Sequence, residues 1–110
     1  MPLMRESDTR TLVITSGQTT SSAAEIANFG LFGMILPSTY DGTAMTFEVS
    51  ADGTNWFALY DNLGVQVSLT VAASRAFDLP LALASFPYFR VVAGTAQSGT
   101  DTSITVVLKG

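Results

Sequence analysis

Apolar and polar residues alternate along several short stretches of the chain, which is the period of a strand with one buried face. The clearest alternation lies in residues 46–51, where every second position is apolar: Phe47, Val49 and Ala51. Asp52-Gly53 then favours a turn, because Asp can hydrogen-bond its own backbone and Gly tolerates a positive φ. Residues 56–60 are aromatic and extended, so this region predicts a β-hairpin closed at residues 51–54.

Further alternating or apolar stretches predict strands at residues 9–16, 31–36, 65–71, 75–79, 88–94 and 102–109, with a weak edge strand within 19–26. The nearly continuous apolar run 31–36 favours a central strand covered on both faces, and Gly33 within it favours a bulge or a close backbone approach. Residues 23–26 are equally compatible with one helical turn. Residues 80–86 predict a short helical turn, because Pro80 suits the first helical position and Pro87 ends it.

About eight strands, separated by turn signals and by no linker or internal repeat, predict an all-β domain. The expected architecture is an antiparallel β-sandwich of jelly-roll type with one short helical turn near 80–86. An immunoglobulin-like sandwich is the alternative. Residues 1–8 carry no clear period and are expected to form an N-terminal arm ahead of a single domain over residues 9–110. In an oligomer this arm could lie across a neighbour and bury Leu3 and Met4.

The composition agrees with one folded domain. The chain has 110 residues, of which 47% are hydrophobic and 13% charged, so disorder is not expected. Its net charge is −4 and its cationic residues are scattered, which disfavours contact with nucleic acid or with an anionic membrane surface. The first eight residues lack the apolar stretch of a secretory signal, and no apolar run is long enough to span a bilayer.

The residues that most often carry catalysis or hold transition metals are missing. The chain has no histidine and no cysteine, which rules out a Ser-His-Asp triad, a cysteine nucleophile, disulfides and zinc sites built from these residues. The acids that could pair for catalysis are Asp41, Glu48, Asp52, Asp61, Asp78 and Asp101. Half of them stand beside Gly or Asn, and turn formation and solvation explain these acids better than paired carboxylate catalysis. Some of these loop acids, with Asn62, could bind calcium, but they lack the spacing of a calcium loop. We therefore expect no catalytic, metal-binding or cofactor-binding residue.

Exposed aromatic side chains could bind sugars or a protein partner. The candidates are Trp56, Tyr40, Tyr60 and Tyr88. Packing in the core or at its rim is the favoured interpretation of Trp56, since aromatic side chains bury a large area. Tyr40 lies in a loop beside Asp41-Gly42 and is the aromatic residue most expected to be exposed. We therefore take Tyr40, with Leu3 and Met4 of the arm, as the candidate partner-binding residues.

Three segments of the chain resemble a known class of protein. They are Phe47-Glu48-Val49-Ser50-Ala51-Asp52-Gly53-Thr54-Asn55-Trp56 with Leu59-Tyr60-Asp61, then Val67 to Arg75, then Tyr88-Phe89-Arg90-Val91. Their order resembles small β-sandwich virion structural proteins of tailed bacteriophages, over most of the chain. The piece Val-Ser-Ala-Asp-Gly-Thr-x-Trp also occurs in discoidin-type carbohydrate-binding domains, where it is a hairpin that such sandwiches need. The resemblance implies a virion component and carries over no catalytic residue.

The resemblance and the composition together favour a non-enzymatic capsid decoration or cement protein. Its expected partners are the major capsid protein and copies of itself, as a homotrimer on the capsid surface of a virion made in the host cytoplasm. Such a protein would bridge neighbouring capsid subunits, and residues 1–8 are the candidate segment that reaches a neighbour. The alternative is a tail or fibre adhesion module that binds host glycans. An enzyme such as a glycan hydrolase is a third hypothesis, and the missing histidine counts against it.

Overall fold

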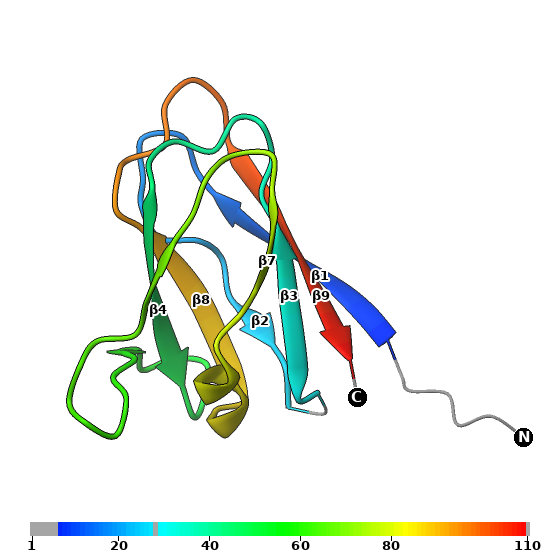
Figure 1. Cartoon of the computed structure of the whole chain (residues 1–110), viewed down its shortest axis with the longest axis vertical. Helices are drawn as coiled ribbons and strands as arrows, with labels where there is room; N and C mark the ends of the chain where they lie inside the picture. The colour runs from blue at the N-terminus through cyan, green and yellow to red at the C-terminus, as the bar shows by residue number, and fades with distance from the viewer. Residues whose placement is uncertain (1–6, 28, 110) are drawn as a thin grey trace, which may run out of the picture.

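The computed structural model describes residues 7–27 and 29–109, which form two antiparallel β-sheets packed face to face (Figure 1). Residues 1–6 of the predicted arm, among them the candidate partner-binding residues Leu3 and Met4, lie outside the described residues. Within the described part of the chain, no helix has both the length and the apolar character needed to cross a membrane.

The described residues contain nine strands and one short 3-10 helix. The strands are β1 (Ser7–Ile14), β2 (Ala24–Glu25), β3 (Leu31–Ile35), β4 (Ala44–Ser50), β5 (Phe57–Ala58), β6 (Ser68–Thr70), β7 (Ala76–Asp78), β8 (Tyr88–Ala93) and β9 (Thr102–Lys109), and the helix is η1 (Leu81–Ser85). The helical turn predicted near 80–86 is therefore present. Of the two interpretations open for residues 19–26, the edge strand is confirmed by β2.

Early strands pair with late ones throughout the sandwich. Sheet A has the strand order β1-β9-β3-β7, and sheet B has the order β2-β8-β4-β5, with β6 also paired to β4. The antiparallel pairs β1 with β9, β2 with β8, β3 with β7, and β4 with β5 and β6 are nested one inside the next. This is the arrangement that a long hairpin adopts when it rolls up into a jelly roll. The predicted all-β sandwich of jelly-roll type is confirmed.

The core lies between the sheets and is formed by the inward positions of the alternating strands. In β9, Ile104, Val106 and Leu108 are buried, while the residues between them are partly exposed. Phe47 on β4 and Phe89 on β8 are the largest fully buried side chains. Because the side-chain period of a strand is two, this burial fixes the register of each pairing.

The central strand β3 departs from the expectation of a strand covered on both faces. Phe32 and Met34 are buried in the core, but Ile35 is 48% exposed on the outer face of sheet A. Leu36, after the end of the strand, is buried too, so the inward positions alternate normally and the run is continuous because the outward Ile35 is apolar as well. The expectation of two covered faces is therefore wrong, and an apolar outer face is left open.

The hairpin after β4 is also longer than predicted. Val49 on β4 pairs with Phe57 on β5. The loop between these two strands is therefore longer than the expected four-residue turn at 51–54. Asp52 organises this connection: its Oδ1 accepts hydrogen bonds from the N–H groups of Asn55 and Thr54, each at 2.9 Å. These bonds hold the pKa of Asp52 well below its usual range. Side-chain hydrogen bonds thus set the shape of the connection.

A buried glutamine joins the loops at one end of the sandwich. Gln97 is fully buried, and its Nε2 donates to the carbonyl oxygens of Asp41 (2.9 Å) and Thr95 (3.1 Å). Its Oε1 accepts from the N–H of Asp41 at 2.9 Å and from the hydroxyl of Thr102 at 3.1 Å. The whole hydrogen-bonding capacity of the amide is used, as burial of a polar group requires.

We predict that Gln97→Leu lowers the free energy of unfolding by about 1–3 kcal/mol, because the backbone N–H and carbonyl of Asp41 lose their partner while the side-chain volume is kept. Urea denaturation followed by circular dichroism measures the change. Gln18→Leu, at an exposed glutamine, is the matched control and should stay within about 0.5 kcal/mol of the parent. Equal losses in the two variants would contradict a bridging role for Gln97.

Candidate interaction surfaces

The loop acids stabilise turns in place of converging on a reactive site. Asp41 Oδ2 accepts hydrogen bonds from the N–H (2.8 Å) and the hydroxyl (3.0 Å) of Ser98, and these bonds lower the pKa of Asp41. Asp101 Oδ1 accepts the N–H of Ser16 at 2.9 Å. Across residues 7–27 and 29–109, no group of three or more acids is placed so that it could hold a metal ion. The carboxylates therefore serve the loops, as the turn interpretation predicts.

Tyr40 is buried, so the expectation that it is exposed is wrong. Its side chain belongs to the core cluster, is 4% exposed and donates its hydroxyl to the carbonyl oxygen of Ala44 at 3.2 Å. Desolvation of the ring raises the pKa of the Tyr40 hydroxyl. The sequence placed Tyr40 in a loop beside Asp41-Gly42 and gave no sign of its burial, because the burial arises only when this loop folds over the end of the core. The surface of the free chain therefore does not present Tyr40 to a partner.

Trp56 packs at the rim of sheet B against a charged pair. The Arg90 guanidinium lies over the Trp56 ring, 4.3 Å from its centroid. Arg90 is directly opposite Glu48 on the neighbouring strand, and its Nη2 lies 2.7 Å from Glu48 Oε1. One face of the indole is thus covered by a cation that is itself held in place. This arrangement favours packing over sugar stacking as the role of Trp56.

The middle of the outer face of sheet A, inside the row that holds Lys109, is nearly free of charge. Two rows of cross-strand neighbours define this sheet A face: Thr9, Val107, Gly33 and Asp78, and next to it Thr11, Thr105, Ile35 and Ala76. Asp78, at the β7 edge, is the ionisable residue among these positions. The buried centres of protein interfaces are depleted in charged residues. The sheet A face therefore has the composition of a surface that another protein covers.

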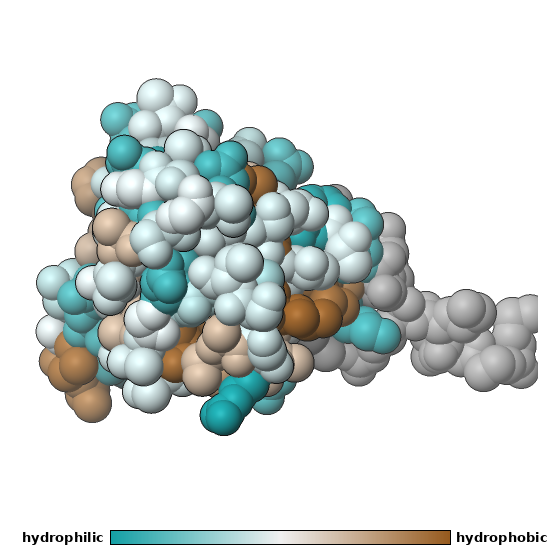
Figure 2. Space-filling model, turned by 90° about the horizontal axis from the view of Figure 1, so that it is seen from above, coloured by the Kyte–Doolittle hydropathy of each residue, from teal (hydrophilic) through white to brown (hydrophobic). Residues whose placement is uncertain are grey.

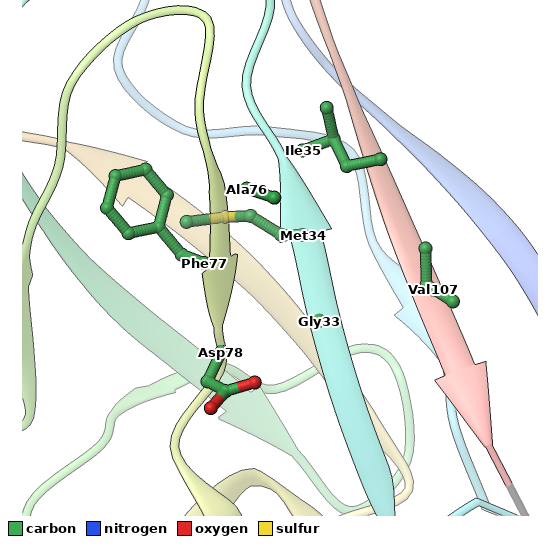
Figure 3. A pocket seen from close by; sticks show the side chains of 7 residues that line it. All are labelled: Gly33, Met34, Ile35, Ala76, Phe77, Asp78 and Val107. Atoms are coloured by element: carbon green, nitrogen blue, oxygen red, sulfur yellow. The ribbon is translucent and has the colours of Figure 1, made fainter.

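A shallow hollow lies over β3 and the edge strand β7 on the sheet A face (Figure 3). Its volume is about 460 Å³, and Figure 3 shows Ile35 and Val107 on neighbouring strands beside the bare backbone of Gly33. Gly33 does not adopt a positive φ, and a Cβ added there would lie 3.6 Å from the Phe77 carbonyl oxygen, an ordinary contact. The expectation of a bulge or close backbone approach is wrong. The glycine leaves space on the surface instead.

The free edge of β1 is blocked by its own side chains. Asp8 Oδ1 accepts the N–H of Thr9 at 2.8 Å, and Arg10 Nη1 donates to the Thr9 carbonyl oxygen at 3.0 Å. Arg10 also pairs with Asp8 Oδ2 at 2.6 Å, and this contact lowers the pKa of Asp8. Further along the strand, the Ser22 hydroxyl accepts the N–H of Val13, and the Ser22 N–H donates to the Val13 carbonyl oxygen. Charged side chains on an edge strand hinder pairing with other chains. Contacts through the faces are therefore favoured over pairing at this edge.

Several large apolar side chains are exposed on β5 and the hairpin that follows it. They define the hairpin patch: Phe57 (68% exposed), Tyr60 (55%), Leu63 (83%) and Val65 (60%). Figure 2 shows hydrophobic side chains gathered in a few separate places on an otherwise pale or polar surface. The sequence pattern missed this patch, because the alternation in residues 65–71 predicted a half-buried strand. Of that stretch only β6 is a strand.

The chain matches no protein-family model and no curated protein sequence. Its fold is similar to that of the SPBc2 prophage-derived protein YomS, with a TM-score of 0.68 and 10% sequence identity over 100% of this chain and 98% of that chain. A protein of the Bacillus endospore appendages, which form disulfide-linked pili, is 12% identical over 96% of this chain and 88% of that chain. Its TM-score of 0.41 is too low to carry an argument. At 10% identity, the first likeness establishes a shared fold.

We predict that Gly33→Ala raises the free energy of unfolding by about 0.5–1 kcal/mol, because alanine loses less conformational freedom on folding and fits the hollow. Urea denaturation measures the change. Gly42→Ala is the control: its φ is 98°, and an added Cβ would lie 2.8 Å from Thr95 Oγ1, so this variant should be destabilised. A similar loss in both variants would mean that the fold itself needs Gly33, against the account of a surface hollow.

Proposed function

We propose that this protein is a non-enzymatic structural component of a bacteriophage or prophage virion, and that it acts as a capsid decoration protein. The sheet A face carries the proposal, since it offers four strands of nearly uncharged surface to a partner. A broad contact surface of this kind suits binding to another protein, whereas a small-molecule site needs an enclosing pocket. The jelly roll shared with a prophage-derived protein over the full length of both chains supports the phage setting.

A decoration protein acts through contact area and through the number of its copies. In the proposed arrangement the sheet A face lies on the head lattice, and the hollow at Gly33 receives a small or apolar side chain of the major capsid protein. Each square ångström of apolar surface removed from water contributes about 25 cal/mol. A copy that spans two capsid subunits thereby opposes their separation. The capsid protein as partner and the capsid surface as location are parts of this proposal.

A tail or fibre module that binds glycans has less support among the described residues. Tyr40 is buried, and the Arg90 guanidinium covers one face of Trp56. Tyr60 is 55% exposed, but it lies among the apolar side chains of the hairpin patch, a setting that suits a protein contact better than a sugar. Sugar stacking needs an accessible aromatic face. We therefore propose the decoration role, and the copy number of the protein per virion distinguishes it from glycan binding on the tail or a fibre.

We predict hundreds of copies of the protein per virion, because a decoration protein follows the symmetry of the capsid lattice. Quantitative mass spectrometry of purified particles, referenced to the major capsid protein, counts the copies. A handful to a few dozen copies would place the protein on the tail or a fibre and favour the glycan alternative. Absence from the particles would overturn the proposal.

A matched pair of substitutions tests which face attaches. Thr105→Lys introduces a charge into the middle of the sheet A face, whereas Thr70→Lys introduces the same charge on the exposed outer side of sheet B. The first should lower the copy number by at least about tenfold, because an unpaired charge in a covered interface is costly. The second should leave it unchanged. Equal copy numbers would contradict attachment through sheet A.

A further inference from the structure

The hairpin patch is built on a rigid support. Tyr60 pairs with Gln66, and the Leu59 carbonyl oxygen accepts the N–H of Val67 at 2.9 Å, so the chain returns on itself as a short hairpin. At the tip, Asp61 Oδ1 accepts the N–H groups of Leu63 (2.9 Å) and Val65 (3.0 Å). The backbone that carries the exposed apolar side chains of the tip is therefore held by hydrogen bonds before any partner binds. Such preorganisation lowers the entropy cost of association.

An apolar pocket adjoins the patch. Its volume is about 380 Å³, and its walls are Val49, Ser50, Ala51, Phe57, Ala58, Leu59, Tyr60 and Phe86. A cavity of about 150 Å³ already holds a benzene molecule, so this pocket has room for an aliphatic side chain. Phe57 and Tyr60 belong to both the pocket and the hairpin patch. The aromatic part of the hairpin patch thus also forms part of the pocket wall, and Leu63 and Val65 follow it along the same short hairpin.

The area of this surface is comparable to that of a small protein interface. Each aromatic residue can bury roughly 150–250 Å². With two aromatic residues and two aliphatic ones more than half exposed, the patch offers on the order of 500 Å², before the pocket walls are added. A standard interface buries about 800 Å² on each partner. The largest apolar patch on a typical monomer is about 300–600 Å² and is often functional, so the hairpin patch has the size of a binding surface.

The charges around the patch argue against an anionic membrane as its occupant. The sequence has no Lys or Arg between Arg10 and Arg75, and the hairpin tip carries the acid Asp61. Arg90, the cation near Trp56, is already paired with Glu48. Binding to anionic lipid draws on free cationic side chains. A protein surface with apolar side chains is the occupant that fits.

We propose that the hairpin patch is the contact between two copies of this chain, related by a two-fold axis. A surface that holds both a protrusion and a pocket can be complementary to itself, and a self-complementary contact closes as a dimer. Leu63 and Val65 of one copy enter the pocket beside Phe57 and Tyr60 of the other, and the reverse contact forms at the same time. In a two-fold contact each copy uses its protrusion and its pocket at the same time, so neither is left for a third copy. The free chain is then a dimer, in place of the homotrimer that the resemblance implies.

This inference deepens the proposed function, because paired copies could link neighbouring attachment points on a lattice. It concerns a different surface, however, and it is measured on the free chain. Failure of the two-fold contact would leave attachment through sheet A untouched. Failure of virion attachment would likewise leave the dimer untouched.

The test is the molar mass of the purified chain across a dilution series, by size-exclusion chromatography with light scattering and by sedimentation equilibrium. The parent should show twice the 11.6 kDa of one chain. Leu63→Lys should weaken association by at least about tenfold, since it places a charge in the pocket of the other copy. Leu81→Lys is the matched control, because Leu81 is also exposed (67%) but lies on η1, outside the patch. It should remain dimeric.

Circular dichroism and thermal unfolding of both variants show that each one folds, which is expected because both leucines are exposed. A parent that is monomeric at every concentration would overturn the proposal. So would a trimer, or a dimer equally weakened by both substitutions. Sedimentation of the parent with vesicles containing phosphatidylserine, with loss of binding in Leu63→Lys, would assign the patch to a membrane and also overturn the proposal.

Discussion

β1 and β9 pair over their full lengths, from Ser7 opposite Lys109 to Ile14 opposite Thr102, and β9 pairs on its other side with β3. The last strand of the described chain therefore lies inside sheet A and joins the first strand to the third (Figure 1). Without β9, sheet A has no continuous inner face to cover Phe47 and Phe89 of sheet B. Contacts between residues so far apart in sequence carry a loop-closure cost that is recovered only when the whole sandwich assembles. The fold is therefore expected to form as one cooperative unit.

This frame leaves different surfaces for different contacts. The open edge of β1 is blunted by Asp8, Arg10 and Ser22, so copies do not readily extend one another's sheet A there. The sheet A face is flat and nearly uncharged, and its hollow at Gly33 exists because one residue lacks a side chain. The hairpin patch lies on the other sheet and is held by Asp61. A nearly uncharged face on sheet A and an apolar patch on sheet B fit the proposed bridging role, in which one surface holds the lattice while the other holds a second copy.

The sequence predicted the strands, because their position follows from the alternation of side chains. It did not predict the features that tertiary contacts or side-chain hydrogen bonds determine. The period of two located β1, β4, β8 and β9, because each has one face in the core. The same period misplaced residues 65–67, which lie in a hairpin stabilised by Asp61 and not in a long strand. The burial of two side chains had no local signal: Tyr40 is covered only once the loops close, and Gln97 acquires its partners from loops distant in sequence. The sequence showed that the outward positions of β3 are apolar as well as the inward ones. It could not show whether the outer face of sheet A is covered by another part of this chain or by a different chain.

A cryo-electron microscopy reconstruction of the intact virion tests the central claim most directly, because it shows both where the protein lies and which face it turns toward its partner. The account predicts sandwiches on the outside of the head, with the sheet A face against the capsid lattice and Ile35 and Val107 covered. Density for the protein confined to the tail, or a sandwich on the head whose sheet A face points to solvent, would contradict it.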